Sequence, residues 1–189
     1  EFKYGKVTDE KETYSLATYG KILPFSRQAI INDDLDAFTR VPALMGRAAH
    51  RTVGNLVYGV LTGNPAMSDG TTLFHADHSN LAGSGAAPST ASFDAARTAM
   101  ATQQDPDGNV TALNIRPAYV LAPVALEGVA STVLNSEYEV GASTKNNTTP
   151  NSVRSLATLI TDARLDTAST TAWYMAANGM SHDTIEVAY

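Results

Sequence analysis

The sequence predicts an α+β fold, on three observations. One stretch of about 18 residues has the apolar spacing of a long helix, and several short apolar segments later in the chain have strand character. These strands follow mixed helices instead of alternating regularly with them, which favours α+β over a doubly wound sheet. With 189 residues, 43% of them hydrophobic, the chain can bury a sizeable core in one or two units.

The longest predicted element is a helix over residues 42–62. Pro42 suits the first turn of a helix, and Gly63 followed by Asn64-Pro65 ends it. Two adjacent columns with i+4 spacing form a broad apolar stripe, which we expect to be buried core. The columns are Leu44, Ala48, Thr52, Leu56 and Val60, and Met45, Ala49, Val53, Val57 and Leu61.

The segment before this helix has a different character. Residues 13–23 are rich in β-formers and predict an extended strand, although they do not alternate strictly. Ser26 can cap a short helical turn over residues 27–32. Asp33 and Asp34 then precede the long helix, where carboxylates stabilise an N-terminus.

The rest of the chain predicts shorter elements. Residues 63–92 predict a long loop, with an internal hinge or surface loop at 83–89. A loop of this length is either functional or mobile. Ser92 can cap a helix over 93–104. We further expect a strand at 117–121, a helix opened by Pro123, a polar loop at 141–152, and strands at 155–163, 171–176 and 184–189, with 166–169 joining the first two. The apolar face of the helix after Pro123 comprises Leu126, Val129, Ala130, Val133 and Leu134.

The tetrapeptide His75-Ala76-Asp77-His78 is the strongest candidate for a metal-binding or catalytic site in the sequence. Two histidines and an aspartate could hold a metal ion. However, the histidines are three residues apart in a loop, whereas a helical pair would be four apart, and no further ligand is evident. A polar loop whose histidines bond the backbone is the favoured interpretation.

Other candidate sites have simpler explanations. No G-x-S-x-G elbow is present, and Gly83-Ser84-Gly85 resembles one only superficially. The sequence shows no nucleophile–base signature with any of its four histidines, His50, His75, His78 and His182. Asp33, Asp34 and Asp36 could bind a cation, but helix capping is the simpler explanation and is favoured. Trp173 and Tyr174 favour strand core over a base-stacking platform. We therefore assign no catalytic, cofactor-binding or metal-binding residue.

Composition excludes several classes of protein. The absence of cysteine excludes disulfides, thiol nucleophiles and cysteine-based zinc sites, and it fits a reducing compartment. A net charge of −6 lacks the basic footprint of a sequence-specific DNA-binding protein. The sequence contains no run of about 18 apolar residues, so it predicts no membrane span.

One stretch of the sequence is specific enough to indicate a family. It is Glu12-Thr13-Tyr14-Ser15-Leu16-Ala17-Thr18-Tyr19-Gly20-Lys21-Ile22-Leu23-Pro24-Phe25, continuing to Leu35. It resembles the major head subunit family of Mu-like phages and prophages, some of whose members are fused to a Clp-type prohead protease. The resemblance continues through residues 62–70, 73–75, 78–83, 113–119, 164–166, 172–174 and 183–186. It therefore covers most of the chain.

The resemblance implies the Hong Kong 97 phage-type major capsid fold, with an axial domain, a spine helix and part of a peripheral domain. On that template residues 1–25 are an extended-loop or arm segment. Residues 26–112 hold the spine helix and peripheral elements with long loops, and residues 113–189 form the axial sheet and helices. No motif for a crosslinking lysine transfers to this sequence.

The implied function is a structural subunit of an icosahedral phage head, located in the virion capsid and made in the host cytoplasm. Its partners would be copies of itself in hexamers and pentamers, a scaffold or prohead protease, portal and decoration proteins, and packaged DNA held non-specifically. No membrane, cofactor or enzymatic activity is expected. The alternative is a hydrolase, a remnant of a prohead protease. Because the arm and the outgoing limb of the extended loop are missing from this sequence, we expect the chain by itself to form a monomer or small oligomer.

Overall fold

The structure, a computed structural model, contains both helices and a sheet, in agreement with the predicted α+β class. It divides into a helical unit, Thr13–Gly63 with Val187–Tyr189, and a sheet unit, Asn64–Glu186 with Glu1–Glu12. The division falls where the sequence ends the long helix. The structure describes residues 15, 17–22, 24, 26–31, 37–104, 112–141, 148–182 and 185–187.

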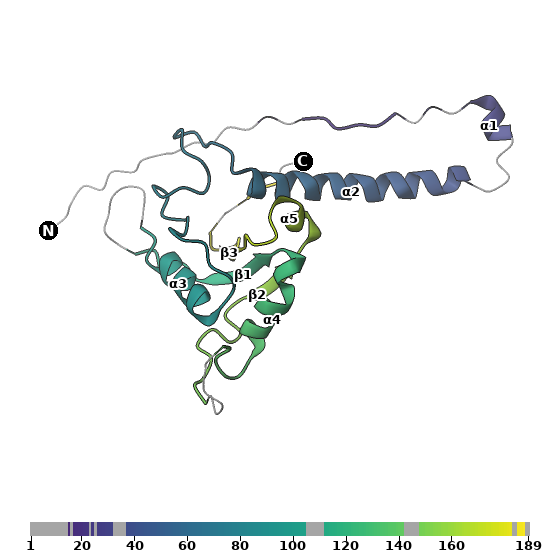
Figure 1. Cartoon of the computed structure of the whole chain (residues 1–189). Helices are drawn as coiled ribbons and strands as arrows, with labels where there is room; N and C mark the ends of the chain where they lie inside the picture. The colour runs from purple at the N-terminus through teal and green to yellow at the C-terminus, as the bar shows by residue number, and fades with distance from the viewer. Residues whose placement is uncertain are drawn as a thin grey trace. The chain divides into compact units, whose positions relative to one another are not determined.

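The helical unit contains α1 (Arg27–Ile31) and the long helix α2 (Ala37–Gly63), drawn in Figure 1. The predicted end at Gly63 is confirmed, but the predicted start at Pro42 is wrong, since the helix begins five residues earlier. Pro42 lies inside α2, where it lacks the N–H that would bond to the Phe38 carbonyl. That loss is confined to a single hydrogen bond near the helix start.

The strand predicted at residues 13–23 is not formed by the described part of that segment. Residues 15 and 17–22 form no hydrogen-bonded ladder. β-forming side chains are not enough for a strand, because a strand also needs a neighbour with which to exchange backbone hydrogen bonds.

The apolar stripe of α2 is mostly exposed, so the expectation that all of it is core is wrong. Leu61 near the helix end is 8% exposed, whereas Leu56 is 45% and Leu44 56% exposed. The helix is about 40 Å long. Within the helical unit the described residues supply only the five-residue α1 and no strand to cover it.

The sheet unit is built on three strands in the order β2-β1-β3. The central strand β1 (Pro117–Ala122) pairs in parallel with β2 (Thr158–Thr161) and antiparallel with β3 (Tyr174–Ala177). The strand predicted at 117–121 is thus confirmed. A parallel pair needs a crossover, and here the chain returns from β1 through a helix.

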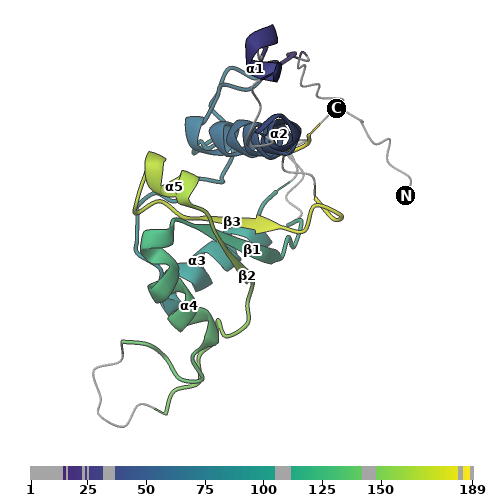
Figure 2. The same cartoon turned by 90° about the vertical axis from the view of Figure 1, so that its right-hand side faces the viewer.

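That crossover is the short 3-10 helix η1 (Val124–Leu126) followed by α4 (Glu127–Asn135). With α3 (Thr90–Ala101), α4 covers one face of the sheet (Figure 2). The predicted apolar face of α4 is largely confirmed, although Val129 is 49% exposed. The core cluster between these layers comprises Phe93, Val120, Ala130, Val133, Leu134 and Val153.

Helix α3 differs from its prediction at both ends, since it ends at Ala101 and not at residue 104. It begins at Thr90, because Ser89 is the N-cap. Ser92, predicted as the cap, instead completes a capping box: its hydroxyl accepts the Ser89 N–H at 2.9 Å, and its N–H bonds the Ser89 hydroxyl at 3.1 Å.

The last third of the chain also departs from its prediction. The strands predicted at 155–163 and 171–176 shrink to β2 and β3, and α5 (Ala163–Ala168) replaces part of the predicted connection at 166–169. Asp162 starts α5, since its carboxylate accepts the Arg164 N–H at 2.8 Å. Of the strand predicted at 184–189, the described residues 185–187 form none.

Candidate functional site

The segment after α2 is a hydrogen-bonded loop. Asn64 holds both backbone groups of Phe74: its Oδ1 accepts the N–H at 2.6 Å and its Nδ2 donates to the carbonyl at 3.2 Å. Ala66 and Thr72 form an isolated bridge, and Gly70 turns the chain between them with a positive φ of 84°. The first part of the predicted 63–92 loop is therefore fixed by local bonds.

His78 lies at the centre of this loop. Its Nε2 is 2.8 Å from Asp69 Oδ2 and 2.8 Å from Thr71 Oγ1, and its Nδ1 is 3.1 Å from the Leu73 carbonyl. The hydrogen bond to Asp69, followed by that to Leu73, raises the pKa of His78 above its ordinary value. Bonds from Thr71 and His78 hold the pKa of Asp69 far below its usual range. The pairing therefore favours the protonated imidazolium of His78 and the ionised carboxylate of Asp69.

His75 is held differently from His78. Its Nδ1 lies 3.2 Å from Asp77 Oδ2, and the two imidazole rings are 6.4 Å apart. Both nitrogens of His78 already contact protein oxygens, and each histidine pairs with its own aspartate. Among the described residues, no group of three or more histidine and carboxylate side chains could hold a metal ion.

The serine candidate has no catalytic surroundings in the part of the chain that is described. Ser84 is exposed, and no hydrogen bond between described residues joins it to a histidine. Two shallow hollows in the sheet unit, one beside Ser155 and one beside Gly128, have no ionisable side chain in their linings. Asp33, Asp34 and Asp36 lie outside the described residues.

Trp173 belongs to the core, as the sequence predicts. Its ring packs edge-on against Phe93, with centroids 5.1 Å apart and an interplanar angle of 83°. Its Nε1 also donates to the Ala86 carbonyl at 2.8 Å. This bond ties the predicted hinge at 83–89 to the residue just before β3, a contact between segments 87 positions apart that no local pattern signals.

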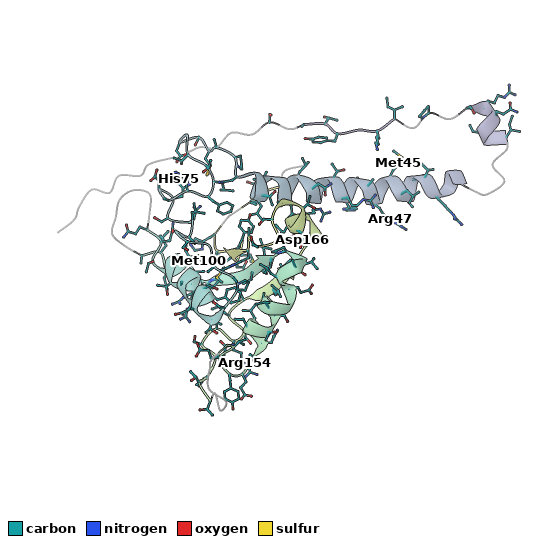
Figure 3. The ribbon with its side chains drawn as sticks, viewed as in Figure 1. Met45, Arg47, His75, Met100, Arg154 and Asp166 are labelled. Atoms are coloured by element: carbon teal, nitrogen blue, oxygen red, sulfur yellow. The ribbon has the colours of Figure 1, made fainter. Side chains whose placement is uncertain are left out.

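Exposed apolar side chains gather in the helical unit. Ile22 is 95% exposed, and Met45, Leu56 and Val60 are also exposed along one side of α2. Figure 3 shows Met45 and Arg47 projecting to opposite sides of this helix. Exposed apolar side chains that share one side of a helix are typical of a surface that associates with another protein.

The exposed apolar side chains of α2 are those of a protein that associates with other protein chains. The sequence matches the family described as phage capsid protein over residues 9–189, so the chain belongs to that family. No curated protein and no solved structure matches the chain. The resemblance drawn from the sequence to a phage major capsid family is confirmed.

Family membership gives the chain a structural role. A phage capsid protein associates with copies of itself in a shell and is located in the virion capsid. Among the described residues, none of the helices combines the length and the apolar character needed to cross a bilayer.

Proposed function

We propose that this chain is the shell-forming subunit of a tailed-phage or prophage head and assembles into hexamers and pentamers around packaged DNA. The observation that carries the proposal is the family match over residues 9–189. The exposed apolar side of α2 supports it, because a subunit that functions alone would leave that surface in water.

The proposal extends to the Hong Kong 97 phage-type fold. Residues 1–25 correspond to the arm or extended loop, residues 26–112 to the spine helix with peripheral elements, and residues 113–189 to the axial domain. The continuous helix α2 and the mixed sheet covered by α3 and α4 support this assignment. Synthesis in the host cytoplasm and contacts with a scaffold or protease, portal and decoration proteins belong to the same proposal.

Co-expression tests the proposal. The gene that encodes the chain is expressed together with the genes beside it, and the products are examined by electron microscopy and mass spectrometry. We expect closed particles in which this chain is the most abundant protein. Particles that form without the chain, or a chain that stays monomeric with every neighbouring gene present, would overturn the proposal.

A matched pair of variants tests the role of α2. Leu56→Gln lies on the exposed apolar side of α2, and Leu81→Gln replaces a leucine of similar exposure in the sheet unit. Glutamine keeps a high helix propensity, so α2 should persist. We expect Leu56→Gln to reduce particle yield and Leu81→Gln to leave it unchanged, while circular dichroism shows that both variants are folded.

A further inference from the structure

Arginines form a stripe along α2. Arg40, Arg47 and Arg51 are spaced by seven and four residues, close to two helical turns and one, so they share one side of the helix. The stripe runs for about 16 Å along the axis. All three residues are exposed.

The stripe lies in an unusual electrostatic setting. Helix α2 contains no aspartate or glutamate, and its three arginines contribute all of its formal charge. Removing them from the net charge of −6 leaves −9 for the rest of the chain. The ion pairs formed among the described residues use His75, His78, Arg97 and Arg164, and none of them involves the stripe.

The two sides of α2 therefore call for different partners. Arg47 projects away from Met45 (Figure 3). By helical spacing the exposed Leu56 and Val60 lie on the same side as Met45. An apolar surface gains free energy when protein covers it. A guanidinium gains most from bidentate contact with carboxylate or phosphate.

We propose that the stripe of Arg40, Arg47 and Arg51 binds the phosphate backbone of the enclosed nucleic acid. The inference rests on the proposed shell function, because a shell places a polyanion against one of its surfaces. Duplex DNA carries one negative charge for about every 1.7 Å of its axis, so a linear stripe of cations meets phosphates in any register. Such binding is independent of base sequence and agrees with the acidic character of the whole chain.

The competing partner for the stripe is the acidic surface of a second copy. The side of α2 that carries Met45, Leu56 and Val60 already supplies a surface for protein, and Met45 projects away from Arg47. Among the exposed large apolar residues of α2, Leu44 lies on the arginine side, between Arg40 and Arg47. A second protein on the arginine side would enclose the helix between two neighbours. A polyanion on that side needs only the three guanidinium groups, so nucleic acid is the simpler partner.

Fluorescence anisotropy of the purified chain with a labelled duplex of about 30 base pairs tests the inference. Three phosphate contacts give a slope near −2.7 in log K against log salt, so affinity should fall about 40-fold between 50 and 200 mM salt. Arg47→Gln/Arg51→Gln should leave a fall of only about 3- to 4-fold. The control Arg116→Gln/Arg154→Gln removes the same charge from exposed sites in the sheet unit and should behave like the wild type.

An equal effect of both double variants, or none from the α2 pair, would overturn the inference. Sedimentation of the same samples tests whether the stripe instead binds a second copy of the chain. Self-association lost in Arg47→Gln/Arg51→Gln with unchanged DNA binding would assign the stripe to a protein contact and refute the proposal. Particle formation is measured separately. If particles form but the α2 double variant binds DNA like the wild type, only this inference is refuted. If the α2 double variant loses DNA affinity but no particles form, only the shell function is refuted.

Discussion

The carboxylate of Asp166 in α5 accepts the backbone N–H of Val124 at 2.6 Å, at the first residue of η1. Its other oxygen accepts the N–H of Ala125 at 3.0 Å. One side chain thus satisfies two free amides at a helix start and joins two elements that are about 40 residues apart.

Replacing Asp166 should therefore destabilise the sheet unit. We expect Asp166→Ala to lower the free energy of unfolding by about 1–2 kcal/mol, the usual cost of losing a helix cap. Urea denaturation followed by circular dichroism measures the change. The control is Asp94→Ala, which removes a partly exposed i,i+3 pair with Arg97 on α3 and should cost less than about 0.5 kcal/mol. Equal effects of the two substitutions would contradict the role assigned to Asp166.

Asn151 provides a second test, since it is a buried polar residue, only 8% exposed. Its Nδ2 donates to the carbonyls of Val133 and Ser136 at 2.6 and 3.0 Å, and its Oδ1 accepts the Val153 N–H at 3.0 Å. Asn151→Ala leaves these backbone groups without their hydrogen-bond partner, and we expect the free energy of unfolding to fall by about 2–4 kcal/mol. Asn135→Ala, at an exposed position, should cost under about 0.5 kcal/mol, and a similar cost at both sites would refute the argument.

The third prediction separates the core from the surface of α2. Phe93 is fully buried, so Phe93→Ala should cost about 3–5 kcal/mol. Leu56→Ala removes a side chain that is 45% exposed and should cost less than about 1 kcal/mol in the isolated chain. Thermal and urea unfolding of both variants measure the difference. A cost above 2 kcal/mol for Leu56→Ala would show that the chain buries this side of the helix.

The fourth prediction concerns the protonation of His78. Because its pKa is raised in the folded chain, its contribution to stability is full below the ordinary value of 6.5 and is lost as pH rises through the raised pKa. Asp69, with a lowered pKa, contributes above its ordinary 3.8 and loses that contribution as pH falls through its lowered value. The loop bonds should therefore weaken toward alkaline pH.

NMR titration of the His78 ring tests this prediction. Asp69→Asn should move the pKa of His78 down toward its ordinary value. The control Asp77→Asn removes the carboxylate beside His75 and should leave the pKa of His78 unchanged. An unaltered midpoint in Asp69→Asn would mean that the pairing with His78 does not form in solution.

Periodic patterns and strong stop signals predicted the larger elements. The i+4 columns and Gly63 located the body and end of α2, and the short apolar run at 117–121 located β1. The burial of α2 could not be predicted in this way, because periodicity shows which side of a helix is apolar but not what covers it. Helix α5 was missed since six residues are too few to show a helical period.

The loop around His78 depends on contacts that have no period. The sequence indicated histidines bonded to backbone, but it did not pair His78 with Asp69, nine positions earlier. A usable signal was Asp69-Gly70, a dipeptide that favours tight turns and lies between the bridged residues Ala66 and Thr72. Similarly, whole-chain acidity concealed the basic stripe of α2, because net charge averages over surfaces that function separately.

The strand order β2-β1-β3 also bears on how the subunit is made. The central strand is synthesised first, and the end of β3 follows 55 residues after the end of β1. At typical elongation rates that delay lasts roughly 3 to 11 s. Until β2 ends, 39 residues after β1, β1 has neither of its partners, which is an interval of roughly 2 to 8 s. Nascent subunits on neighbouring ribosomes therefore expose the same unpaired apolar strand, and this interval is when a chaperone would protect them most from mispairing.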